Sequence, residues 1–500
     1  MKNTINIINF IRGCEPRVSH DLKEAVQEQI KLSKKYNLPM TFLYQYDAMV
    51  KPDFVDLLKN EKDFELGVWF EFSRWIVEKV GLEWRGSDDW DWHSHVDLTM
   101  GYTVDERKLL LDEAMRFFKE LFGYYPKTVG SWAIDAVSIN YLYEKYDVDM
   151  VLICKEQWGT DGYSLWGGYY SEGYYPCKNN MLCPAQSQEE QIDVPVFRML
   201  GSDPVDQYMN GIGTEWQNVN SMETVYSASG ANKEWVEWFL SEVFDTSNIG
   251  LNYCQAGQEN AFGWHAMKDG YKIQMELFDQ ARKNGSIDFE FAGETGRKFK
   301  EKYKTTPVSS TDAHKKNCSA VWYNSKYYRS SIFYNIGEIF IRDLTIFNEK
   351  YKERYLENIT KDKSIFYDNL PVVDCFKWSD TENIGGLFFE KDGKKVVASG
   401  DFISDTLSDN SLKVRIPTQY GDIEVIYNEK SVSFIFPESG FSMNAELYNG
   451  KTSVVGFSNE KILCEYEGFK YEIEMTGAEC TVGDNNFRIS VLNKAFEMRF

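Results

Sequence analysis

The first 300 residues alternate between short apolar runs and longer segments of helical periodicity. Apolar residues recur every three or four positions in 21–36 and 103–122, which predicts two amphipathic helices. Such alternation favours parallel strands joined by helical crossovers, and seven strand units predict an incomplete (β/α) barrel instead of an eightfold one. The seven runs with strand character are 5–11, 39–46, 64–70, 128–134, 150–154, 194–200 and 250–254.

The pattern changes towards the C-terminus. Residues 301–375 are mixed and predicted to be mostly helical. From about 376 onwards, short alternating runs are separated by Gly, Asn and Asp, which is typical of a β-sandwich. We therefore expect a barrel catalytic domain over 1–300, a mixed or helical linking segment over 301–375, and an all-β sandwich over 376–500.

Composition and charge narrow the class of protein. The 500 residues are 43% hydrophobic and 16% aromatic, as in a folded globular chain with many aromatic rings. The net charge of −22 repels phosphate backbones, so we expect no nucleic-acid partner, and it also favours solubility. No run of 18 apolar residues is present, so no membrane span is predicted.

The N-terminus and the cysteines bear on the compartment. The apolar run 5–11 is short and interrupted by asparagine, which predicts a first strand and not a signal peptide. Nine cysteines occur without a C-x-x-C pair, which argues against a disulfide framework and a zinc ribbon. Scattered thiols suit a reducing cytoplasm, where we place the protein. The sequence is compatible with a homo-oligomer.

Two carboxylates follow predicted strands at positions where (β/α) barrels keep catalytic groups. Asp135 ends the segment Gly-Ser-Trp-Ala-Ile-Asp, and Glu259 lies in Gln-Ala-Gly-Gln-Glu-Asn-Ala-Phe-Gly-Trp. Two carboxyl groups brought together by the fold are the minimum equipment of a glycosidase. As alternatives, Asp135 could cap the next helix and Glu259 could be satisfied by backbone groups.

The segment 88–98 concentrates polar and aromatic residues. It holds two of the five histidines of the chain, beside four Asp and two Trp. In a strand, His93 and His95 would point to the same side, and with Asp91 they could bind a divalent metal. As the alternative, neutral histidines could hydrogen-bond a sugar.

Aromatic and charged residues near the predicted strand ends are candidates for substrate binding, because sugars stack their apolar faces on aromatic rings. Asp203 could hold a sugar hydroxyl or serve as a turn residue before Pro204. An arginine-rich pocket, closed by Arg329 and Arg342, would suit an anionic sugar. The predicted substrate-binding residues are Arg12, Glu15, Trp84, Arg85, Trp92, His93, His95, Trp132, Asp203 and Trp264.

Patches of the first 300 residues resemble glycoside hydrolase family 57. The segment 130–135 resembles the Gly-Phe-Trp-Leu-Pro-Glu segment of that family, whose nucleophile falls at Asp135. The segment 258–264 resembles the family's Asp-x-Glu-x-Phe-Gly-x-Trp region. The acid/base Asp of the family falls at Gly257, which leaves Glu259 as the nearest substitute.

Other segments resemble polysaccharide deacetylases, which share the seven-stranded barrel. Ser-His-Val-Asp-Leu at 94–98, followed by a helix and by Gly-Tyr-Tyr-Pro, is similar to the Ser-His-Pro-Asp-Leu and Gly-x-x-Pro motifs of these enzymes. Their first metal-binding histidine falls at Asp91. Their catalytic Asp pair has no counterpart in 10–17, and metal and base both need it.

Together these features predict a glycosidase that acts on an oligo- or polysaccharide with retention and without a cofactor. Asp135 would attack the anomeric carbon, and Glu259 would protonate the leaving oxygen and later activate water. One alternative is a metal-dependent carbohydrate deacetylase that uses Asp91, His93 and His95. Another is a barrel that binds carbohydrate without catalysis.

Overall fold

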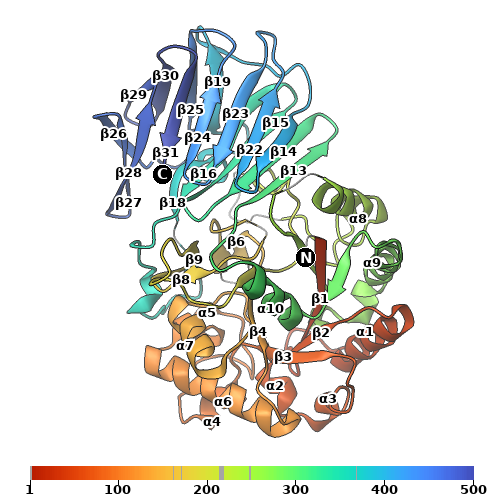
Figure 1. Cartoon of the computed structure of the whole chain (residues 1–500). Helices are drawn as coiled ribbons and strands as arrows, with labels where there is room; N and C mark the ends of the chain where they lie inside the picture. The colour runs from red at the N-terminus through yellow and green to blue at the C-terminus, as the bar shows by residue number, and fades with distance from the viewer. Residues whose placement is uncertain (1–2, 161–162, 171, 213–218, 247–248, 368) are drawn as a thin grey trace.

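The computed structural model describes residues 3–160, 163–170, 172–212, 219–246, 249–367 and 369–500. Its N-terminal part is a nearly closed parallel barrel, in the lower half of Figure 1. The seven strands run in the order β10-β5-β4-β3-β2-β1-β11, and β12 (Asp288–Glu290) also pairs with β1. The predicted barrel is therefore confirmed, with strands β1 (Asn3–Ile11), β2 (Thr41–Tyr44), β3 (Glu65–Trp69), β4 (Thr128–Gly130), β5 (Met150–Ile153), β10 (Val196–Arg198) and β11 (Asn252–Ala256).

Helices cover the barrel strands, which explains their continuous apolar runs. Eight of the nine residues of β1 are buried, as expected for a parallel strand covered on both faces. Asp21 caps α1, and Thr103 and Glu106 form a capping box at the start of α6, so both predicted amphipathic helices begin where expected. The long helices are α1 (Leu22–Tyr36), α6 (Val104–Phe122), α7 (Ala136–Tyr146), α8 (Lys233–Leu240), α9 (Trp264–Asn284) and α10 (Ala292–Lys302).

Short elements connect the barrel units. None of the helices in the described residues is both long and apolar enough to cross a membrane. The short helical segments are α2 (Tyr46–Met49), α3 (Pro52–Val55), α4 (Arg74–Lys79), α5 (Ser94–Asp97), α11 (Cys375–Trp378), η1 (Thr99–Gly101), η2 (Ser241–Asp245), η3 (Asn260–Phe262) and η4 (Arg354–Leu356). The insertion after β5 contributes β6 (Gln157–Thr160), β7 (Tyr163–Leu165), β8 (Pro176–Cys177) and β9 (Asn180–Pro184), and β17 (Ile365–Phe366) pairs with β7.

The segment predicted to be mostly helical differs from the prediction. Residues 309–346 form four antiparallel strands, whereas α10 ends before them and only short helical turns follow. The middle two strands are almost continuously buried, so their sequence lacks the polar–apolar alternation that marks a half-exposed strand. The four strands are β13 (Ser309–Lys315), β14 (Cys318–Asn324), β15 (Tyr328–Asn335) and β16 (Glu338–Ile346).

These strands belong to a C-terminal pair of antiparallel sheets, at the top of Figure 1. Side chains of both sheets, such as Met443 and Phe434, share one apolar core, which confirms the predicted sandwich. The first sheet continues with β18 (Leu370–Asp374), β19 (Gly386–Lys391), β20 (Lys394–Lys395), β25 (Phe441–Glu446), β29 (Ala478–Val482) and β30 (Phe487–Val491). The second contains β21 (Ile403–Ser408), β22 (Ser411–Ile416), β23 (Ile423–Asn428), β24 (Ser431–Ile435), β26 (Val454–Ser458), β27 (Lys461–Tyr466), β28 (Phe469–Thr476) and β31 (Ala495–Arg499).

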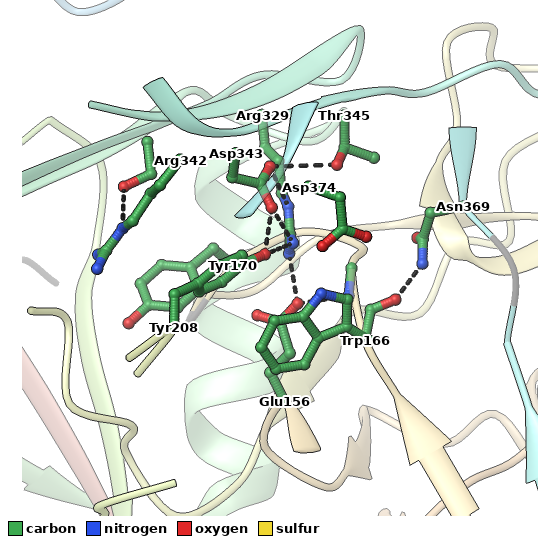
Figure 2. A network of polar contacts seen from close by, with 12 residues as sticks. Glu156, Trp166, Tyr170, Tyr208, Arg329, Arg342, Asp343, Thr345, Asn369 and Asp374 are labelled. Carbon is green, nitrogen blue, oxygen red and sulfur yellow. Dashed lines mark hydrogen bonds and ion pairs between the residues drawn. The ribbon is translucent and has the colours of Figure 1, made fainter. Parts of the chain in front are cut away.

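A buried polar network joins the sandwich to the barrel. Arg329 on β15 reaches Glu156, just after β5, at 2.9 Å and Asp343 on β16 at 2.6 Å, as Figure 2 shows. Tyr208 donates a hydrogen bond to Asp343. Arg342 lies beside this network and donates to the carbonyl oxygen of Pro204 at 2.7 Å. Both arginines are buried at the interface, so they do not close an arginine-rich pocket as predicted.

Candidate active site

A cavity of about 550 Å³ lies at the carboxyl ends of the barrel strands. Its wall is built from residues that follow different strands, the arrangement by which parallel barrels assemble catalytic sites. Arg12 comes directly after β1, Glu71 after β3, Trp132 after β4, Lys155 after β5 and Glu259 after β11. Groups far apart in the sequence therefore meet in one cavity.

Arg12 is the charged centre of the cavity. Its guanidinium lies 3.2 Å from Glu15, 3.0 Å from Glu71 and 3.2 Å from Glu259, and it stacks 4.2 Å over the ring of Trp90. Burial alone would lower the pKa of Arg12, but the three carboxylates outweigh burial and raise the pKa. The guanidinium thus stays charged and holds three acidic side chains around one point.

Asn260 ties two cavity loops together. Its side-chain oxygen accepts from the backbone N–H of Arg12 at 2.8 Å, and its amide nitrogen donates to the Arg12 carbonyl at 2.8 Å. The loop after β1 is thereby fixed to the loop after β11, which carries Glu259. This pairing holds the Arg12–Glu259 contact in a defined geometry.

One further carboxyl group, Asp97, borders the cavity and is affected by the charge of Glu71. Glu71 accepts from Trp69 Nε1 at 2.6 Å and from Arg12, yet burial raises its pKa. Asp97 lies at the end of α5 with 3% of its surface exposed. Burial, followed by the negative charge of Glu71, raises the pKa of Asp97 well above its usual value. Burial and the neighbouring negative charge thus favour the protonated form of Asp97 over the charged one.

Nothing in the described residues satisfies one oxygen of Asp97. Its Oδ1 atom is buried and accepts no hydrogen bond from this part of the protein. The side chain nevertheless borders the cavity. A buried polar atom without a partner is costly and needs an explanation, and a ligand in the cavity would supply the missing partner.

Aromatic rings form the other surfaces of the cavity. Trp132 stacks against Tyr163, with ring centroids 6.3 Å apart and an interplanar angle of 23°. Trp90 and Trp92 also border the cavity. Flat apolar rings beside hydrogen-bonding groups are what a sugar ring needs, because it presents apolar faces and a polar edge.

An ion pair borders the cavity beyond Arg12. The ammonium of Lys155 directly contacts the carboxylate of Glu223, and each side chain is only 7% exposed. Glu223 also accepts from Ser221 Oγ at 3.0 Å. Glu223 keeps Lys155 charged, because its attraction raises the pKa of Lys155 although burial lowers it.

The structure corrects the predicted role of Asp135. Its carboxylate is fully buried, does not border the cavity, and caps α7 by accepting from Ser138 N at 2.9 Å. Arg107 pairs with it at 3.0 Å. Strand β4 ends at Gly130, so Asp135 lies five residues beyond the strand, whereas Trp132 reaches the cavity. The retaining mechanism with Asp135 as nucleophile is therefore wrong.

The Asp135→Asn variant should lose stability and keep its activity. The amide still caps α7, but Arg107 is left without a buried counter-charge, which costs about 3–5 kcal/mol. Thermal denaturation should show a lower midpoint, while kcat measured well below that midpoint stays within about twofold of wild type. A large fall in kcat with an unchanged midpoint would return Asp135 to the active site.

The predicted metal ligands do not form a site. His93 precedes α5 and His95 lies within it, so they do not share the face that a strand would give them. His93 Nδ1 lies 2.5 Å from Asp91, and neither histidine borders the cavity. Among the described residues, no group of three His, Cys, Asp or Glu side chains could hold a metal ion. In the cavity, the guanidinium of Arg12 already occupies the middle of the acidic cluster.

Some predicted substrate-binding residues lie in the cavity wall and others do not. Arg12, Glu15, Trp92 and Trp132 border the cavity, as does Glu259, which was predicted to be catalytic. The others have separate structural roles. Trp84 donates to the Asp88 carbonyl at 2.7 Å, Arg85 donates to the Gly101 carbonyl at 2.9 Å, Asp203 accepts from Val205 N at 2.9 Å and pairs with Lys315, and Trp264 packs in the barrel core.

Several cavity residues were absent from the prediction. Lys155 comes just after a predicted strand, so strand-end position alone could have identified it. Glu71 also follows a predicted strand, and the sequence marked it only as a charged residue near a strand end and not as a site residue. Asp97 sits in the segment 88–98 that the sequence singled out, but only Asp91, His93 and His95 of that segment were predicted to have a role in the site. His20 and His265 also border the cavity, with ring centroids 5.1 Å apart, and no sequence spacing links them.

Gly257 explains why the acid of family 57 has no direct counterpart. Its φ is +111°, and a Cβ placed there would lie 2.0 Å from the backbone oxygen of Ile8. No side chain fits at this position without moving β1. The position to which the resemblance assigns the acid of family 57 therefore cannot carry a carboxyl group in this fold.

Comparison with known proteins bears on the fold. No protein-family model matches the sequence, and no curated protein matches it. Among solved structures, the chain is similar to a protein from Parabacteroides distasonis provisionally described as a glycoside hydrolase/deacetylase, with a TM-score of 0.51 and 15% identity over 73% of this chain and 88% of that one. This similarity supports the fold of the barrel and does not single out family 57.

Two further solved structures are also similar, each with a lower score. A protein from Mycobacterium smegmatis, provisionally described as a polysaccharide deacetylase, has a TM-score of 0.39 and 12% identity over 61% of this chain and 92% of that one. A protein from Pseudomonas aeruginosa with a similar provisional description has a TM-score of 0.35 and 15% identity over 60% and 91% of the two chains.

Proposed function

We propose that this protein is a carbohydrate-acting hydrolase that cleaves a glycosidic bond by carboxyl chemistry. One observation carries the proposal. A buried carboxyl group with an unsatisfied oxygen and a raised pKa, Asp97, and a second carboxyl group in contact with a guanidinium, Glu259, border the same aromatic-lined cavity. Two carboxyl groups in different surroundings, one shielded from water and one beside a cation, are the usual acid and base of a glycosidase.

Each group has a separate task in this scheme. Asp97 donates its proton to the oxygen of the leaving sugar, so the leaving group departs as an alcohol. Glu259 acts as the carboxylate at the anomeric carbon, where it attacks directly or removes a proton from attacking water. Arg12 orients Glu259 and Glu71 and does not transfer a proton. In this proposal Asp97 takes the role of the acid that the sequence had predicted for Glu259.

Product analysis tests the proposal. Wild-type protein is incubated with a panel of acetylated and non-acetylated oligosaccharides, and new reducing ends and free acetate are measured in the same samples. We expect reducing ends without acetate. Release of acetate without new reducing ends would contradict the proposal and identify the activity as deacetylation.

Deacetylation is the second candidate function, because the description of the Parabacteroides distasonis protein covers both activities. The residues that border the cavity do not fit the metal that such chemistry uses, since Arg12 stands where a cation would sit. A third candidate is a barrel that only binds carbohydrate. Tight binding of a glycan with neither product would support it.

A further inference from the structure

We propose that the Lys155–Glu223 ion pair makes the cavity selective for an uncharged sugar. The inference rests on the proposed function and adds the substrate class. A paired ammonium and carboxylate offer a donor and an acceptor side by side, which suits two neighbouring hydroxyl groups of a neutral sugar ring. Neither member of the pair is free to neutralise a charged substituent.

The pair is built into the cavity wall. Both side chains border the cavity with 7% of each exposed, so a ligand can touch them while bulk water is largely excluded. The backbone at Lys155 is held in place by its neighbour Glu156, which pairs with the buried Arg329 at 2.9 Å. Glu223 is fixed by Ser221. Such preorganised groups discriminate strongly between ligands.

The charges of the whole cavity point the same way. The Lys and Arg side chains that border it all have carboxylate partners: Arg12 has three, Arg17 pairs with Glu15 at 2.8 Å, and Lys155 pairs with Glu223. An anionic sugar would therefore meet cations that are already neutralised, within a wall of five carboxyl groups. The cavity therefore favours a neutral sugar and not the anionic sugar that an arginine-rich pocket would have suited.

Three matched sets of monosaccharides test the inference in binding experiments. Glucose, glucuronate and glucosamine form one set, and the galactose and mannose series form the others. Binding is followed by the fluorescence of the cavity tryptophans. For wild type we expect the neutral member of at least one set to bind about tenfold or more tightly than its uronate and its amine.

Single variants of the pair should shift the preference in opposite directions. Glu223→Gln frees the ammonium of Lys155, so uronate affinity should rise about tenfold while neutral affinity falls. Lys155→Met frees the carboxylate of Glu223, so the affinity for the amino sugar should rise instead. The double variant should lose neutral binding without gaining either charged ligand.

Controls separate this selectivity from a structural role. The exposed pair Lys233–Glu237 on α8 is changed in the same way and should alter no affinity. Thermal denaturation confirms folding, and if one single variant does not fold, the other still predicts a shift of defined sign. An equal loss for all three ligands, or wild-type binding that does not favour the neutral sugar, would overturn the inference.

The proposed function can fail separately. Selective binding with no hydrolysis of any glycan would refute the proposed function and leave the selectivity standing. Hydrolysis combined with unselective binding would refute the selectivity and leave the hydrolase. The monosaccharides contain no glycosidic bond, so the binding data are obtained without turnover.

Discussion

The Asp97→Asn variant is expected to lose between about a hundredfold and ten-thousandfold in kcat, the range that general acid catalysis supplies. The amide keeps the size of the side chain but has no acidic proton to give to the leaving oxygen. KM should change little, because the aromatic walls and the Lys155–Glu223 pair remain. The measurement is kcat and KM on the best glycan of the panel. Asp88→Asn, an exposed change in the same segment, is the matched control.

A second, independent readout is how activity and stability depend on pH in the wild type, compared with Asp97→Asn. Burial and Glu71 raise the pKa of Asp97, so wild-type activity should be lost as pH rises through that raised pKa. Because the folded state holds this proton more tightly than the unfolded state, stability also falls as pH rises from the unfolded pKa to the folded one. Asp97→Asn should be more stable than wild type at neutral pH. A less stable variant with normal turnover would exclude Asp97 as the acid.

Glu259→Gln is expected to have the second large effect. Removing the carboxylate at the anomeric carbon should lower kcat by about a hundredfold to ten-thousandfold, because the amide neither attacks nor accepts a proton. The fold should persist, since Arg12 keeps Glu15 and Glu71 as partners.

A variant with a shorter side chain, Glu259→Ala, tests whether the carboxylate of Glu259 acts at the anomeric carbon. Glu259→Ala leaves space for a small anion. If the anomeric carbon of the substrate lies at this position, added azide should restore turnover and yield a glycosyl azide. Asp135→Asn serves as the comparison and should not respond to azide. Normal turnover by Glu259→Gln would remove Glu259 from the mechanism.

Much of the fold could be predicted because the barrel strands are continuous apolar runs bounded by helical periodicity. The prediction failed over 309–346, where burial on both faces removes the alternation that identifies a strand. The second sheet of the sandwich was easier to predict, because strands such as β22 and β23 alternate between buried and half-buried residues.

Residues that lie close behind a strand were the easiest part of the site to predict. Arg12 follows β1 at once and Glu259 lies three residues after β11, and both reach the cavity. Asp135 is further from its strand, and the chain has already turned into α7. Asp97 comes from a short helix outside the strand pattern, and its proton affinity depends on the neighbouring Glu71, which is 26 residues away in sequence. Sequence spacing carries no record of that contact.

Turnover after metal removal tests the central claim most directly. Wild-type protein is treated with excess chelator and dialysed, and the release of reducing ends from its best glycan is measured before and after Zn²⁺ or Mg²⁺ is added. Catalysis by Asp97 and Glu259 predicts an undiminished rate that neither ion increases. Loss of turnover on chelation, restored by one of these ions, would contradict the account.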